Sequence, residues 1–149
     1  MAIESGGRRR WMSVLAQASG AELERAWLAL GERPAYRIVR KPEVGLVMVR
    51  GRAGGSGAAF NLGEMTVTRC TVDLPSGIAG HAYVAGRDAR HAELAAVFDA
   101  LLQDPLRAAQ LEEGVIAPLE AGQQERRRRV AARSAPTRVE FLTLVRGGD

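Results

Sequence analysis

The amino-acid sequence predicts an α+β fold in which helices at both ends flank an antiparallel β-meander. Three observations predict it. Apolar residues recur with a helical period near the start of the chain, the period changes to two between Pro34 and Arg87, and a helical period returns from Asp88. The connections between the predicted strands are too short for crossovers, so the strands should be antiparallel. We expect residues 1–149 to form a single domain, because no convincing domain boundary interrupts them.

The N-terminal third is predicted to form a pair of helices. The first carries an apolar stripe at helical spacing, made of Trp11, Val14, Leu15 and Ala18. Ser19 and Glu22 then have the spacing of a capping box, in which each side chain satisfies a backbone amide at a new helix start. The stripe of that second helix is Leu23, Ala26, Trp27 and Leu30. The two segments should therefore form an αα-hairpin or a kinked pair.

The middle of the chain alternates as half-buried strands do. Tyr36–Arg40 and Leu46–Arg52 are two candidate strands. The segment Ala53–Gly57 cannot continue a strand and must turn. After Phe60–Gly63 come two further candidates, Thr66–Asp73 and Ile78–Ala85. The tight turn Pro75-Ser76-Gly77 between them predicts a β-hairpin.

A long helix is predicted to follow the strands and to pack on the sheet. It begins at Asp88, a suitable N-cap residue, and runs to about Gln103, with Pro105 beyond its end. Its buried side is marked by His91, Leu94, Ala95, Phe98, Leu101 and Leu102.

The C-terminal part is predicted to contain two helical pieces and a final strand. A short piece covers Leu106–Glu113, and a longer C-terminal helix lies within residues 119–133. Pro136 should then break the chain before Arg138–Arg146, which we expect to be a strand. Because neither face of this strand is polar throughout, it should lie centrally in a sheet or be covered by a partner.

The composition limits the class of protein. The 149 residues are 46% hydrophobic and 26% charged, which is ordinary for a globular protein and excludes collagen-like and low-complexity chains. The one cysteine, Cys70, cannot form an intramolecular disulfide. No apolar run approaches the ~18 residues that span a bilayer, and the run after Arg8–Arg10 is too short for a signal peptide. We therefore expect a cytoplasmic protein with no membrane partner.

The basic residues are almost all arginine. The sequence has 21 Lys and Arg against 17 Asp and Glu, for a net charge of +4, and only Lys41 is a lysine. The run Arg126–Arg129 suggests nucleic-acid binding, but four consecutive residues of a helix point to different sides. Glu120 and Glu125 lie nearby, and the scattered aromatic residues form no stacking platform. We therefore expect a solvated or subunit-facing surface and no nucleic-acid partner.

Two segments are candidate anion sites. Glycines in Gly51–Gly57 leave backbone amides free to point at an anion, next to Arg50 and Arg52, although the segment has no P-loop pattern and a flexible turn is the alternative. At the second site, Arg87 precedes a helix start whose amides attract anions. The alternative there is that Asp88 caps the helix and Arg87 pairs with a carboxylate.

Metal binding and nucleophilic catalysis have little support in the sequence. His81, His91 and Cys70 have the spacing of no zinc site, so we expect no metal. Cys70 with His81 or His91 could make a small hydrolase or transferase, but no third residue orients the histidine. A buried, inert Cys70 is the simpler interpretation.

Four segments of the chain are distinctive, and in order they are WMSVLAQAS, GLVMVRGRAGGSGAAFNLGEMTVTRC, GHAYVAGRDARHAELAAVFDALL and EFLTLVRG. Together they resemble the PhnG family, a subunit of the bacterial carbon–phosphorus lyase core complex. The resemblance extends from about Trp11 to Gly147. The positions that match family motifs are Gly54, Gly55, Gly57, Phe60, Asn61, Gly63, Glu64, Arg69, Cys70, Gly86, Arg87, Asp88, His91, Glu93 and Arg146.

The resemblance implies a role in organophosphonate catabolism. Such a complex transfers a phosphonate to C1 of the ribose of ATP and releases adenine. The implied partners are a nucleosidase-type subunit, a radical S-adenosylmethionine subunit with an iron–sulfur cluster, and the remaining core subunit. The resemblance implies no cofactor and no complete active site in this chain. A stand-alone anion- or nucleotide-binding module is the alternative function.

Combining the residues with the resemblance gives one set of candidate anion, substrate or interface residues, while catalytic residues stay unassigned. The candidates are Arg50, Arg52, Gly54, Gly55, Gly57, Arg69, Arg87, Asp88 and His91.

Overall fold

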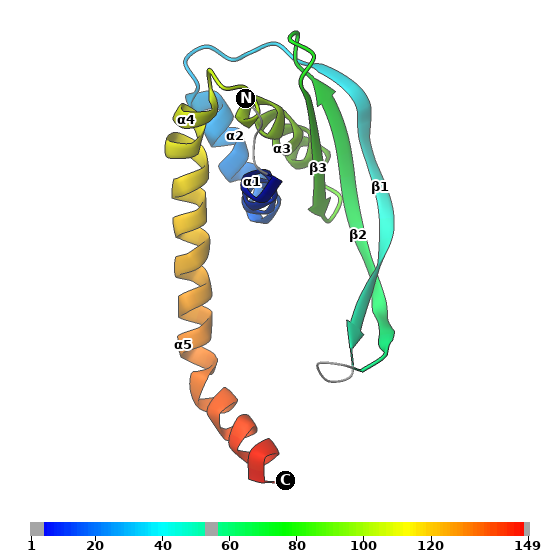
Figure 1. The fold of residues 1–149 in the computed structure, drawn as a ribbon, viewed down its shortest axis with the longest axis vertical. Helices are drawn as coiled ribbons and strands as arrows, with labels where there is room; N and C mark the ends of the chain where they lie inside the picture. Colours follow the sequence, from blue (N-terminus) through cyan, green and yellow to red (C-terminus); the bar gives the residue numbers. More distant parts are fainter. Residues whose placement is uncertain (1–4, 53–56, 148–149) are drawn as a thin grey trace.

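Two arms project from one end of a compact helix-and-sheet body (Figure 1). The computed structural model describes residues 5–52 and 57–147, with the backbone alone from residue 134 onward. The elements in chain order are α1 (Ser5–Gln17), α2 (Gly20–Ala29), β1 (Arg37–Arg52), β2 (Ala59–Asp73), β3 (Ala79–Ala85), α3 (Ala89–Leu102), α4 (Ala108–Leu111), a π-helical turn (Glu112–Ile116) and α5 (Ala117–Gly147). The predicted α+β class is confirmed. One arm is the far half of the β1–β2 pair, and the other is α5.

The predicted N-terminal helical pair is confirmed. Glu22 donates its backbone N–H to Ser19 Oγ at 3.1 Å, and Glu22 Oε1 accepts the Ser19 N–H at 3.0 Å, which completes the capping box of α2. The residues of the α1 stripe are all buried, as are Leu23 and Trp27 of α2. Both helices therefore face the core with the side that their periodicity indicates.

The sheet is a three-stranded antiparallel meander in the order β1-β2-β3. The predicted hairpin is confirmed, because Val67 pairs with Ala85 at one end and Asp73 with Ala79 at the other. Gly77 turns the chain between β2 and β3 with a φ of +94°, a conformation that favours glycine. Side chains of Cys70 and Ala82 face the helices, whereas those of Thr71 and His81 face away.

The two predicted strands Tyr36–Arg40 and Leu46–Arg52 are one continuous strand, which corrects the expectation of a break. Pro42, which has no backbone N–H to donate to a ladder, lies between the two predicted strands. Since β1 is an edge strand, Pro42 can occupy a register irregularity between Arg40 and Glu43 without removing a bond from a central strand. The long strand β1 extends the β1–β2 pair far beyond β3.

The predicted long helix is confirmed as α3, and it packs on the inner face of the sheet. Asp88 is its N-cap, and every residue from Leu94 to Leu102 is buried. Gly80 of β3 lies where the helix backbone comes closest. A Cβ on Gly80 would lie 2.0 Å from the Ala96 carbonyl oxygen and 2.7 Å from the Ala100 nitrogen. The close packing of helix on strand therefore requires glycine at this position.

The predicted final strand over Arg138–Arg146 is wrong, because these residues continue α5 to Gly147. An apolar run with no polar face is compatible with a strand or a helix, so periodicity does not distinguish the two. Extending an existing helix avoids the cost of nucleating new structure. Pro136 is accommodated within α5 with the loss of one backbone hydrogen bond, and the helix bends along this arm (Figure 1).

Candidate functional site

The predicted glycine-rich anion site lies at the end of the β1–β2 arm. Arg50 is exposed and pairs in register with Asn61, and no carboxylate in the described part of the chain contacts it. Arg52 ends β1, and Gly57 lies at the bend that leads into β2. Gly54 and Gly55 lie outside the described residues. Anion binding by this segment stays a prediction.

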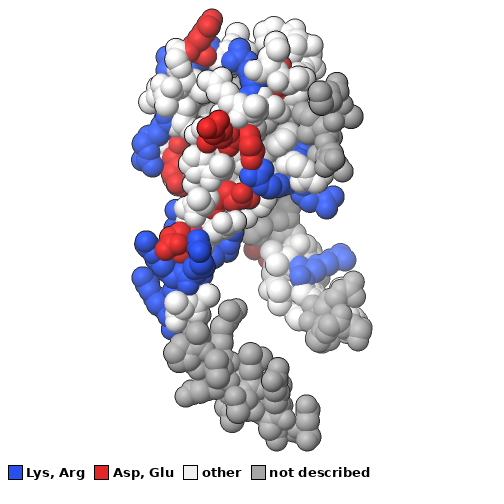
Figure 2. Space-filling view, turned by 60° about the vertical axis from the view of Figure 1, so that its left-hand side comes forward, with Lys and Arg blue, Asp and Glu red and all other residues white. Residues whose placement is uncertain are grey.

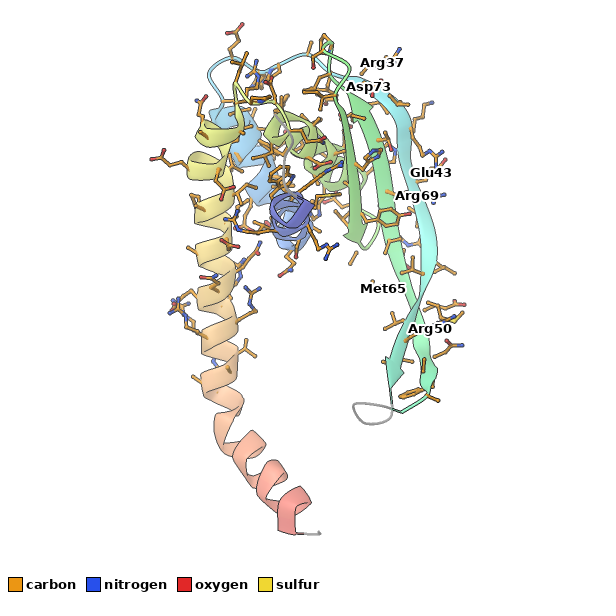
Figure 3. All side chains as sticks on the ribbon, in the orientation of Figure 1. Arg37, Glu43, Arg50, Met65, Arg69 and Asp73 are labelled. Carbon is orange, nitrogen blue, oxygen red and sulfur yellow. The ribbon has the colours of Figure 1, made fainter. Side chains whose placement is uncertain are left out.

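Arg69 lies at the centre of the outer sheet face, between neighbours on both adjacent strands (Figure 3). Its Nη2 donates to Glu43 Oε2 of β1 at 3.3 Å. Hydrogen bonds with Tyr83 of β3 and with Glu43, together with the negative charge of Glu43, raise the pKa of the Arg69 guanidinium. Arg69 therefore connects all three strands while remaining exposed to a ligand or partner.

A shallow hollow of about 460 Å³ lies beside Arg69 on this outer face. Its polar side chains come from alternate positions of the strands, and His81 Nδ1 lies 3.1 Å from Thr71 Oγ1. Arg40 of β1 also lines the hollow, and no carboxylate in the described part of the chain pairs with it. No local sequence pattern marks Arg40 as a site residue, because only the register of the sheet brings it near Arg69. The hollow offers hydrogen-bond donors to an anionic or polar surface.

The predicted anion site at the start of α3 is filled by the chain's own carboxylate. Asp88 Oδ1 accepts the backbone N–H of His91 at 3.1 Å, as the capping alternative predicted. Arg87 is exposed, and no carboxylate within the described residues pairs with it. Arg87 is therefore available to an external anion or partner, whereas Asp88 is occupied.

His91 does not face this corner. The side chain is buried with 7% exposure, and its Nε2 donates to the Leu15 carbonyl oxygen at 3.0 Å. That bond connects α3 to α1. The environment of His91 is the one expected for a structural histidine.

Cys70 lacks the surroundings of a nucleophile. It is buried in the core, and burial raises the pKa of its thiol to about 11. Because Cys70 pairs with Ala82 and Thr71 pairs with His81, the thiol and the His81 ring lie on opposite faces of the sheet. The sheet therefore separates Cys70 from His81, while His91, the other histidine of the small-hydrolase alternative, is bonded to the Leu15 carbonyl oxygen.

A buried carboxylate missed by the sequence analysis lies between α1, α3 and β3. Asp99 is fully buried and accepts hydrogen bonds from Arg8, from Trp11 Nε1 at 2.8 Å and from the His81 backbone N–H at 2.9 Å. The available signal was an acidic residue inside the otherwise apolar run from Leu94 to Leu102. Since its partners come from two other elements, α1 and β3, and include a cation, Asp99 acts as a structural centre.

Within the described residues, no three His, Cys, Asp or Glu side chains are grouped so that they could hold a metal ion. The helices in the described ranges include none that is both long enough and apolar enough to cross a bilayer.

Comparison with known proteins identifies similar sequences along nearly the whole chain. Residues 6–147 match the family described as phosphonate metabolism protein PhnG. A protein of Rhizobium meliloti (strain 1021), the alpha-D-ribose 1-methylphosphonate 5-triphosphate synthase subunit PhnG, is 49% identical over 145 residues. That alignment covers 95% of this chain and 90% of the relative.

Proposed function

The chain belongs to the PhnG family of phosphonate metabolism proteins, and on that premise we propose that it is a subunit of an α-D-ribose 1-methylphosphonate 5-triphosphate synthase. The observation that carries the proposal is the 49% identity to a subunit of that name, across 95% of the chain. The complex would transfer a phosphonate to C1 of the ribose of ATP and release adenine.

The role proposed for this chain is to support the reaction within a hetero-oligomer. The outer sheet face supports that role, because it presents Arg40 and Arg69 around an open hollow. Arginine binds carboxylates and phosphates through a planar fork, so this face suits an acidic partner surface or an anionic substrate.

The finer assignments belong to the same proposal. The partners would be a nucleosidase-type subunit, a radical S-adenosylmethionine subunit that holds the iron–sulfur cluster, and the remaining core subunit. This chain would hold no cofactor of its own, and the complex would act in the cytoplasm.

Reconstitution tests this function. The chain and the other synthase subunits of the same organism are purified separately, mixed, and supplied with ATP and methylphosphonate. Adenine release is measured by chromatography. We expect no release from this chain alone, release from the full mixture, and loss of release when this chain is omitted.

Two results would contradict the proposal. Full adenine release without this chain would mean that it is dispensable for the reaction. Full release from this chain alone would mean that it is an independent enzyme.

A further inference from the structure

The β1–β2 arm has an unpaired strand edge. β3 pairs with β2 only from Val67 to Asp73, and the last bond on that side joins the Gly86 N–H to the Thr66 carbonyl oxygen at 2.9 Å. From Ala59 to Met65, β2 pairs with β1 alone among the described strands. An open edge of this length is a template for another strand.

Large apolar side chains of this arm are exposed to solvent. On β1, Leu46 is 64% exposed and Met48 is 53% exposed. On β2, Leu62 is 63% exposed, and Phe60 and Met65 are also exposed. A two-stranded ribbon is marginally stable in water by itself, and contiguous exposed apolar side chains mark interaction sites. The residues of this arm therefore suit the interior of a larger sheet.

The charges on β1 indicate the chemistry of the partner. Arg37 pairs with Asp73 and Glu43 with Arg69, which leaves Arg40, Lys41 and Arg50 without a carboxylate in the described part of the chain. Among the described residues of β2, Glu64 is the only acidic side chain that forms no ion pair with a described Lys or Arg.

The opposite arm is also basic. Figure 2 shows Lys and Arg gathered on α5 where it leaves the body, and these include Arg126–Arg129. A second copy of this chain would bring the same net charge of +4 and gather like charge at the contact. An acidic partner would be attracted instead.

We propose that an extended segment of an acidic partner subunit adds to β2 as a strand along Ala59–Met65, in the position that β3 leaves empty. This inference rests on the proposed function, because the partner is another subunit of the synthase. Main-chain hydrogen bonds to β2 supply affinity, and apolar side chains of the partner cover Leu62 and its neighbours.

Strand addition makes a residue-specific prediction about amide exchange. The Thr66 carbonyl points to the β3 side, so the alternation of an antiparallel ladder directs the Glu64 N–H to the open edge and the Met65 N–H to β1. In the isolated chain the Glu64 amide should exchange quickly and the Met65 amide slowly. In the reconstituted complex, the Glu64 amide should exchange about 100-fold more slowly, while the Met65 amide changes little.

A substitution tests the apolar contacts. Leu62→Glu should weaken assembly with the other subunits about 10-fold or more. Leu28→Glu is the matched control, because Leu28 of α2 is 59% exposed, close to the 63% of Leu62, but lies outside the arm. Both isolated variants should unfold at the temperature of the wild-type chain, since neither side chain is buried.

The outcomes separate the two proposals. Suppose that the wild-type chain assembles with the synthase subunits. If Leu62→Glu then assembles equally well, or if the Glu64 amide stays unprotected in the complex, strand addition is wrong and the proposed function stands. If the wild-type chain does not assemble at all, the proposed function fails. If the isolated chain is a dimer that Leu62→Glu dissociates, the occupant is a second copy and the acidic partner is excluded.

Discussion

Arg8 of α1 holds the buried Asp99 of α3 through two parallel hydrogen bonds, Nε to Oδ1 at 3.1 Å and Nη2 to Oδ2 at 2.8 Å. Trp11 and the backbone of His81 donate to the same carboxylate. The pair therefore joins α1, α3 and β3 at one point. A buried carboxylate with several donors is costly to disrupt, because every donor loses its partner together.

Asp99→Ala should lower the free energy of unfolding by about 3 kcal/mol, since the Trp11 N–H and the His81 amide lose their acceptor. This loss lies at the lower end of the range for buried pairs, because the Arg8 side chain is 34% exposed and solvent weakens its attraction to Asp99. Calorimetry should show Tm falling by about 6 to 12 °C. Glu125→Ala, which removes only exposed pairs on α5, is the control and should change Tm by about 1 °C or less. Equal Tm values for the two variants would exclude a structural role for Asp99.

Gly80→Ala should destabilise the chain by about 2 kcal/mol or more, because its Cβ would overlap the backbone of α3. The urea midpoint of unfolding measures the effect. Gly45→Ala on β1 provides the comparison, since a Cβ at Gly45 meets nothing within 4 Å. If both substitutions leave the midpoint unchanged, α3 does not pack on β3 as closely as described.

Local signals explain which parts of this fold could be predicted from the sequence. The capping box at Ser19, the turn at Gly77 and the N-cap Asp88 act within a few residues, and each was predicted. The continuity of β1 through Pro42 was not predicted, because a proline is tolerated there only if β1 is an edge strand, which the local sequence does not specify.

The features that were not predicted depend on contacts between residues far apart in the sequence. The grouping around Asp99 depends on Arg8, 91 positions away, and Arg40 approaches Arg69 only through strand register. The same limit applies to the candidate site. The Asp88 cap was predictable from spacing, whereas the contact between His91 and the Leu15 carbonyl required the packing of α3 against α1.

Tyr36 should make stability depend on alkaline pH. Burial, followed by the hydrogen bond to Glu93, raises the pKa of the Tyr36 hydroxyl above its ordinary value of 10.0. Above pH 10 the unfolded chain loses this proton before the folded chain does. The free energy of unfolding therefore falls as the pH rises from about 10 through the pKa of Tyr36 in the folded chain. Urea unfolding between pH 8 and pH 11 should show wild-type stability decreasing more steeply than that of Tyr36→Phe. Parallel curves would mean that Tyr36 titrates alike in both states.

Arg87→Ala should lower adenine release by the reconstituted complex without dissociating it. Arg87 is exposed at the start of α3 and pairs with no carboxylate in the described part of the chain, so its guanidinium is available to an anion. Loss of one charge-assisted contact should reduce the rate about 10-fold or more. Arg9→Ala, which removes another exposed arginine, on α1, controls for the general loss of positive charge. Size-exclusion chromatography of each mixture separates the possible effects. If the Arg87→Ala complex falls apart, Arg87 is an interface residue and the anion-binding assignment is wrong. If Arg9→Ala slows adenine release as much as Arg87→Ala does, the effect is only one of net charge.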